Sequence, residues 1–225
     1  MINNCSPWLI AHIQGISCQK CQRSVARGVW VLLALSLAGC LGLVRPNFEA
    51  EIVNLRPGNY SLDPDHTFVL FRIDHLGLSQ VIGRFNEVEA NLEFDPDDIE
   101  AMQLDGRIAT ASIDVGNEEF ESQLRSASWL SSEQFPDARF TTESVTADAD
   151  GNLTILGQFS LRGVTLPLQM DGRFNGGADN ILTGKYTLGF AANGVISRKS
   201  YGIDDFGALV GDDIEIEIQA EFQQL

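Results

Sequence analysis

Hydrophobic and polar residues alternate with a period of two through most of the chain after residue 58. The alternation is most regular at 69–75, 102–108, 153–161 and 214–222. A period of two is typical of β-strands with one buried face. Segments rich in Asp, Asn, Gly and Pro separate these runs, as expected for turns. The pattern predicts an all-β domain with about eight strands.

One segment departs from this alternation. Asn117 suits a helix N-cap, and Phe120 and Leu124 follow at the i, i+4 spacing of one helix face. Trp129 and Phe135 come soon after. We expect one short helix and its loop to cover an end of the domain.

The absence of strand–helix alternation argues against a parallel α/β fold. A sandwich and a closed antiparallel barrel both fit the pattern. An eight-stranded barrel has an interior that is filled by side chains or holds one small ligand, as in lipocalins. Glycines at inward positions either mark strand bends or leave space inside. A bend is the better interpretation of any single one, but five together make a hollow interior as credible as a filled one: Gly83, Gly106, Gly157, Gly172 and Gly184.

The N-terminal region has a different character. An apolar run at 29–37 follows Arg23 and Arg27, and small residues precede Cys40. These features are typical of a secretory signal. An uncleaved transmembrane helix is the alternative, but the run is short against the ~20 apolar residues of a spanning helix. The segment 37–40 resembles the lipobox of bacterial lipoproteins, which implies cleavage before Cys40 and acylation of its thiol.

This interpretation divides the chain into a signal segment at 1–39, a lipidated tether at 40–58 and a barrel domain at 59–225. It predicts a periplasm-facing protein of the bacterial cell envelope, held to a membrane through the acylated Cys40. The residue after that cysteine is Leu41. By resemblance to lipoprotein sorting, this favours the outer membrane over the inner one.

Charge and cysteine content narrow the function classes. The net charge is −16, and all 31 acidic residues follow Cys40. Such a surface repels phosphate backbones, so we expect no nucleic-acid partner. All four cysteines lie at or before position 40. The domain therefore has neither a disulfide nor a thiolate nucleophile.

The residues also give little support for catalysis or a metal site. His66 and His75 are nine positions apart, so on one strand they would point to opposite faces. No nucleophile-elbow motif is present. The paired carboxylates lie in loop-like stretches. We predict a protein that is not an enzyme and that holds no metal or cofactor of its own.

Seven motifs occur in a fixed order, at 60–77, 81–85, 112–116, 124–126, 135–140, 157–165 and 198–203. Together they resemble the YceI family of lipocalin-like envelope proteins, over residues 59 to 223. The resemblance implies a single antiparallel eight-stranded lipocalin-like barrel with one short helix as a lid. It also implies a hydrophobic tunnel that holds a polyisoprenoid chain, such as a quinone tail or a prenyl lipid.

The resemblance also implies which residues bind the lipid. The tunnel wall would comprise Val69, Phe71, Ile73, Val81, Phe85, Ile108, Phe140, Phe159, Leu161 and Phe190. Leu124, Trp129 and Phe135 would close one end. His75 at the tunnel mouth, with Arg198 and Tyr201 of the late motif, would contact a headgroup.

Some polar positions depart from the family pattern. Gln123 stands where the family usually has a histidine, and Ser197, Ser200 and Tyr201 replace the usual residues around Arg198. These changes affect the expected headgroup region and leave the tunnel wall intact.

The sequence therefore predicts an envelope lipoprotein that buries an isoprenoid or similar amphiphilic lipid for transport, storage or stress response. The alternative is a structural or partner-binding envelope lipoprotein with a filled barrel. Phe68 and Leu70 at outward positions would then allow a homodimer contact.

Overall fold

The computed structural model describes residues 55–148, 150–207 and 209–225. Cys40 and the expected signal and tether therefore lie outside the described residues, apart from the last few residues of the tether. The strands are β1 (Gly58–Leu62), β2 (Phe68–His75), β3 (Ser79–Phe85), β4 (Val88–Phe94), β5 (Gln103–Ala109), β6 (Ile113–Asp114), β7 (Asp137–Ala147), β8 (Asn152–Leu161), β9 (Val164–Asp179), β10 (Tyr186–Ser197) and β11 (Val210–Gln224).

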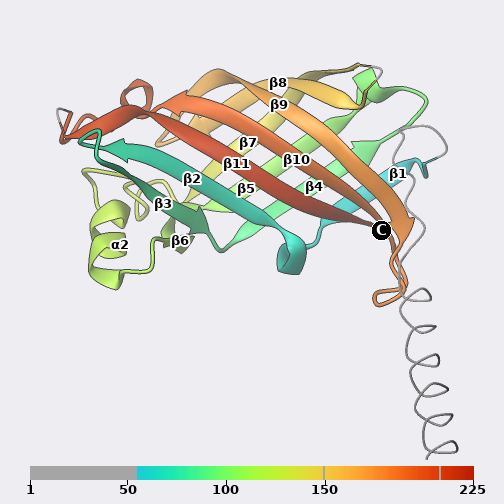
Figure 1. Ribbon diagram of the computed structural model, residues 1–225, viewed down its shortest axis with the longest axis horizontal. Helices are drawn as coiled ribbons and strands as arrows, with labels where there is room; N and C mark the ends of the chain where they lie inside the picture. Colours follow the sequence, from blue (N-terminus) through green and yellow to red (C-terminus); the bar gives the residue numbers. More distant parts are fainter. Residues whose placement is uncertain (1–54, 149, 208) are drawn as a thin grey trace, which may run out of the picture. The chain divides into compact units, whose positions relative to one another are not determined.

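The sheet closes on itself because its first strand pairs with its last. β1 runs antiparallel to β11, with Tyr60 opposite Gln224, and β2 pairs with another part of β11. The pairs β1/β2, β3/β4 and β5/β6 each form one barrel strand with a short interruption. Counted in this way, eight antiparallel strands follow one another around the barrel in sequence order (Figure 1). The predicted fold class is confirmed.

The four strands expected from period-two patterns are all present, as β2, β5, β8 and β11. In β11 the inward isoleucines Ile214, Ile216 and Ile218 alternate with carboxylates on the outer face. Alternation also sets the register, because a slip by one residue would place the isoleucines in water.

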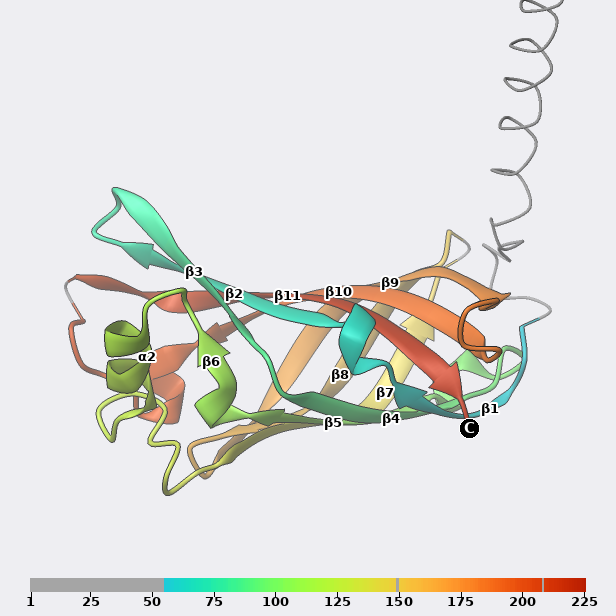
Figure 2. The same cartoon turned by 90° about the horizontal axis from the view of Figure 1, so that it is seen from below.

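One helix, α2 (Glu118–Arg125), lies between β6 and β7, as the sequence predicted. The Asn117 side chain accepts a hydrogen bond from the Phe120 N–H at 3.0 Å and caps the helix. The Glu121 carboxylate accepts from the backbone N–H groups of Val115 and Asn117. Figure 2 shows α2 at the end of the barrel that holds the β2–β3 hairpin and the β10–β11 connection. Among the described residues, no helix is long and apolar enough to cross a bilayer.

The C-terminus lies at the opposite end of the barrel (Figure 1). Aromatic rings of the hydrophobic core, including that of Phe222, pack together at this end. Phe190 makes edge-to-face contacts with Phe174, Phe222 and Phe94, with ring centroids 5.4–6.4 Å apart. Tyr60 meets Phe94 in the same geometry. Such pairs add stability beyond the burial of their area. This end of the barrel is therefore a filled core.

Candidate ligand-binding cavity

The barrel interior contains a cavity of about 400 Å³. Its wall is built mainly from aliphatic and phenylalanine side chains of the barrel strands. The volume falls within the range of small-molecule sites, ~300–1,000 Å³. The cavity arises because the inward side chains of an eight-stranded barrel do not have to meet at its axis.

Most residues predicted to bind the lipid line this cavity. Fourteen of them do so: Val69, Phe71, Ile73, His75, Val81, Phe85, Ile108, Leu124, Trp129, Phe140, Phe159, Leu161, Phe190 and Arg198. They come from β2, β3, β5, β7, β8 and β10, from α2 and from the turns after α2 and β10. The structure thus brings them around one space, and contact with a ligand stays a prediction.

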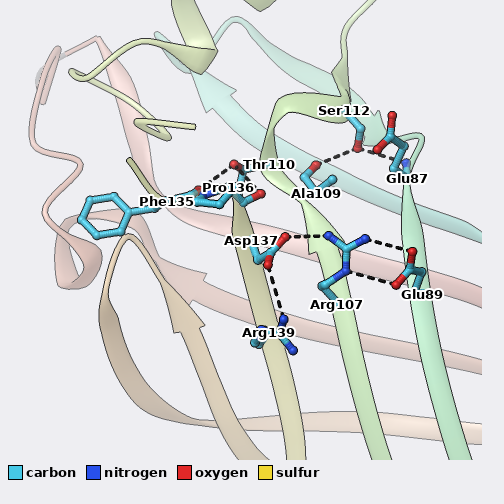
Figure 3. Close-up of polar contacts among 10 residues, drawn as sticks. All are labelled: Glu87, Glu89, Arg107, Ala109, Thr110, Ser112, Phe135, Pro136, Asp137 and Arg139. Atoms are coloured by element: carbon cyan, nitrogen blue, oxygen red, sulfur yellow. Dashed lines mark hydrogen bonds and ion pairs between the residues drawn. The ribbon is translucent and has the colours of Figure 1, made fainter. Parts of the chain in front are cut away.

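Two predicted residues do not line the cavity. Phe135 packs against Gly163 in the turn between β8 and β9, and Figure 3 shows its ring directed away from the neighbouring polar network. Tyr201 is buried behind the wall, edge to face with Phe159 at 5.7 Å. Burial raises the pKa of the Tyr201 hydroxyl. Tyr201 therefore belongs to the buried core beside the cavity, and Phe135 packs at the β8–β9 turn.

The inward glycines have different roles. The ring of Phe71 lies over Gly83, and the ring of Phe140 lies over Gly157, so neither glycine leaves empty space. A Cβ on Gly106 would meet nothing closer than 3.9 Å, and Gly106 lines the cavity. Gly184 lies in the turn between β9 and β10 with a positive φ, so its predicted inward strand position was wrong.

Several lining residues were not included among the ligand-binding residues predicted from the sequence. They include Met102, Leu153, Ile155, Leu168, Met170, Ala192, Ile214, Ile216, Ile218, Ala220 and Phe222. The alternation in β8 and β11 already places Ile155 and Ile216 on the inner face. That signal was sufficient to include them.

The cavity opens at the α2 end. We call His75, Gln123, Phe206 and Leu209 the cavity mouth, because these side chains line the cavity and are also exposed. The β2–β3 hairpin and the loop before β11 meet there through a hydrogen bond from the Leu76 N–H to the Leu209 carbonyl, at 2.9 Å.

Arg198 holds the loop at the mouth. Its side chain is fully buried, and no carboxylate forms an ion pair with it in the described part of the chain. Instead the guanidinium donates, over 2.5–3.0 Å, to the backbone carbonyls of Ile203, Asp205, Val210 and Gly211. The structure gives Arg198 a role in fixing this loop, and headgroup contact stays a prediction.

A polar network fixes the outer side of the cavity wall (Figure 3). Arg107 of β5 donates to Glu89 of β4 and to Asp137 of β7, so it joins three adjacent strands. The hydrogen bond from Arg107 lowers the pKa of Asp137. Nearby, the buried Thr110 hydroxyl donates to the Phe135 carbonyl at 2.8 Å. Arg107, Thr110 and Arg139 of this network also border the cavity, so the network positions its wall.

A second polar cluster lies at the short segment between β1 and β2. Asp63, His66 and Glu221 place possible metal-ligand atoms within 4.8 Å of one another. However, the Asp63 carboxylate already accepts hydrogen bonds from the Asp65 N–H, the His66 ring and the Gln223 amide. These bonds cap the turn Pro64–His66, so the cluster is explained by local structure.

Comparison with known proteins agrees with this architecture. The model of the YceI-like domain family matches residues 60–222. The UPF0312 protein ECA1782 of Pectobacterium atrosepticum is 35% identical over 80% of this chain and 94% of its own length. Protein YceI of an Escherichia coli strain is 34% identical over 80% of this chain and 95% of its own length.

Solved structures share the barrel. BcnA of Burkholderia cenocepacia matches with a TM-score of 0.65 at 16% identity, over 71% of this chain and 98% of its own. A Campylobacter jejuni YCEI protein matches at 27% identity with a TM-score of 0.58, over 68% and 90% of the two chains. A polyisoprenoid-binding domain from Saccharophagus degradans matches with a TM-score of 0.55 at 12% identity, over 74% and 98%.

The closed eight-stranded barrel, its apolar cavity and these matches across nearly the full length of the relatives lead to one assignment. The chain belongs to the YceI family.

Proposed function

We propose that this protein binds a polyisoprenoid or similar amphiphilic lipid inside its barrel. The observation that carries the proposal is the apolar cavity of about 400 Å³. Transfer of an apolar tail from water to such a wall contributes ~25 cal/mol per Å² of area buried. The fold shared with a polyisoprenoid-binding domain from Saccharophagus degradans supports the same ligand class.

A binding role fits the cavity chemistry better than catalysis. General acid–base or nucleophilic catalysis needs ionisable groups within hydrogen-bonding reach of each other. The ionisable residues that line the cavity are His75, Arg107, Arg139 and Arg198. Arg107 and Arg139 donate to surface carboxylates, and Arg198 is committed to four carbonyls. We therefore infer a binding protein rather than an enzyme, with the bound lipid as ligand and no further cofactor.

The ligand test is mass spectrometry of an organic extract of the purified protein. We expect a stoichiometric isoprenoid lipid from the unaltered chain and less from Gly106→Val, whose side chain would occupy cavity space. Gly189→Val is the matched control, because Gly189 does not line the cavity and a Cβ there would meet its nearest neighbour at 3.5 Å.

An empty extract, together with no binding of added long-chain isoprenoids, would contradict the proposal. That result would favour the partner-binding alternative. The exposed Phe68 on the outer face of β2 would then be the first contact to test for a homodimer.

We further propose that the protein acts at the cell envelope as a lipoprotein, for transport, storage or stress response. The support is the segment 37–40 with its apolar and basic flanks. Metabolic labelling with a fatty-acid analogue should label the unaltered chain and not Cys40→Ser. Equal labelling of both would reject acylation at Cys40. If the unaltered chain is labelled, fractionation of the cells would show whether the inner or the outer membrane holds the protein.

A further inference from the structure

The two ends of the cavity differ chemically. Phe190 and Phe222 line the end that the aromatic core closes. At the other end the wall includes the imidazole of His75, the amide of Gln123 and the indole of Trp129. A ligand with a polar head and an apolar tail therefore meets different surroundings in its two orientations.

Trp129 is held in one orientation from several sides. Its ring stacks on Phe206, with centroids 6.0 Å apart and an interplanar angle of 16°. The guanidinium carbon of Arg198 lies 5.9 Å from the ring centroid. The backbone N–H of Trp129 donates to the Ser126 carbonyl at 3.0 Å, and Arg162 donates to the Trp129 backbone carbonyl. The indole is thus fixed before any ligand arrives.

The indole N–H is a buried donor without an acceptor in the described part of the chain. Buried polar groups in native proteins are nearly always hydrogen-bonded, so an unpaired one at a cavity wall indicates a partner from outside the chain. The buried cation of Arg198 close by favours an electron-rich partner atom. Both features suit an oxygen acceptor.

We propose that the lipid enters tail first, and that a carbonyl oxygen of its headgroup accepts a hydrogen bond from the Trp129 indole at the α2 end. A quinone with an isoprenoid tail has this chemistry. This inference rests on the proposed function, since it assigns the orientation and headgroup class of the same ligand.

Thr67 provides an internal comparison. Its hydroxyl also lines the cavity and is also buried without a partner in the described residues. It lies next to the turn Pro64–His66, away from α2. A headgroup bound there instead would place the ligand in a different position.

The test compares two ligands on the full chain: phylloquinone, which has a quinone head on a phytyl tail, and phytane, the corresponding hydrocarbon. Trp129→Phe keeps a ring against Phe206 but removes the donor. We expect it to weaken phylloquinone binding about three- to tenfold and to leave phytane binding unchanged. Thr67→Val should change neither affinity.

A second measurement follows ligand binding in the unaltered chain and uses the variant only for assignment. The indole N–H resonance of Trp129, assigned by its loss in Trp129→Phe, should move downfield when phylloquinone binds to the unaltered chain. Phytane should not cause this shift.

Three outcomes would overturn the inference. Equal weakening of both ligands would limit Trp129 to packing, and a selective effect of Thr67→Val alone would place the headgroup deeper in the barrel. An indole resonance that phylloquinone leaves unmoved would exclude the hydrogen bond. Failure of the unaltered chain to bind either ligand would instead reject the proposed function, and this inference with it.

Discussion

At the scale of single residues, two glycines of the barrel interior each lie beneath a phenylalanine ring. Gly83 pairs with Phe71 across β2 and β3, and Gly157 is covered by Phe140 of β7. The missing side chain lets each ring lie flat against the sheet. Gly106 has no such ring over it, so the same residue type serves two purposes within one barrel.

This difference predicts a ranking of three alanine variants. Gly157→Ala should lower the free energy of unfolding by about 1–3 kcal/mol, because the new Cβ would clash with the Thr141 carbonyl as well as with Phe140. Gly83→Ala should cost less, because its obstacles are side chains. Gly106→Ala should be neutral or stabilise by up to ~1 kcal/mol. Urea denaturation would measure all three, and a costly Gly106→Ala would contradict the ranking.

The pair Asp63–His66 predicts a dependence of stability on pH. The hydrogen bond to Asp63, and then the attraction to its charge, raise the pKa of His66 above 6.5. Burial acts to raise the pKa of Asp63, but hydrogen bonds from His66 and the Asp65 N–H outweigh it and bring the net value below 3.8. The His66 contribution is full below pH 6.5 and is lost as the pH rises through its raised pKa. The Asp63 contribution is full above pH 3.8 and is lost as the pH falls through its lowered pKa.

His66→Gln should therefore destabilise the protein most between pH 3.8 and pH 6.5, where both groups are charged, for example at pH 5.5. The loss should be under ~1 kcal/mol, because the imidazole is largely exposed. At pH 9 the difference from the unaltered chain should shrink. His75→Gln, at the cavity mouth, is the control. A constant difference across the range would show that the ion pair does not stabilise the fold.

At the scale of elements, one buried side chain organises the connection between β10 and β11. Arg198 donates to two carbonyls of the connecting loop, Ile203 and Asp205, and to two at the start of β11, Val210 and Gly211. Arg198→Lys keeps the charge but loses the fork of donors. We expect a loss of about 2–4 kcal/mol in the free energy of unfolding and faster proteolysis within 203–209. Lys199→Ala, on the neighbouring exposed residue, should change neither.

The elements also show how far the sequence could be interpreted. Period-two runs predicted β2, β5, β8 and β11, and Asn117 with Phe120 and Leu124 predicted α2, because each signal is local. The interruptions at Pro64–His66 and Thr110–Ser112 were not predicted. They depend on partners far along the chain, such as Gln223 for Asp63 and Phe135 for Thr110.

The candidate site also divides into features with a local sequence signal, which could be predicted, and features that depend on distant residues, which could not. Inward parity and family resemblance located most of the cavity wall, since alternation decides which face a strand residue takes. The burial of Arg198 was not foreseen, because nothing local shows that four carbonyls will converge on it. The covering of Gly83 and Gly157 was missed for the same reason: rings from neighbouring strands fill the space.

At the scale of the whole molecule, the cavity should couple lipid binding to stability. A ligand that binds only the folded barrel adds RT ln(1 + [L]/Kd), which is ~2.7 kcal/mol at a free concentration of 100 times Kd. Added phylloquinone should raise the melting temperature of the unaltered chain. The rise should be smaller for Gly106→Val and unchanged for Gly189→Val. A similar rise in all three would indicate binding outside the cavity.

The pairing of β1 with β11 has a consequence for biogenesis. Asp63 and Gln223, joined by a hydrogen bond, are 160 positions apart in the chain. Contacts this distant in sequence form slowly, because loop entropy opposes them until the rest of the sheet is in place. A nascent chain that lacks its final strand has two unpaired sheet edges, and such edges recruit other chains. Loss of the last few residues would therefore leave an open barrel that is prone to aggregation. Pairing of the C-terminal part of β11 with β1 is the step that closes the barrel.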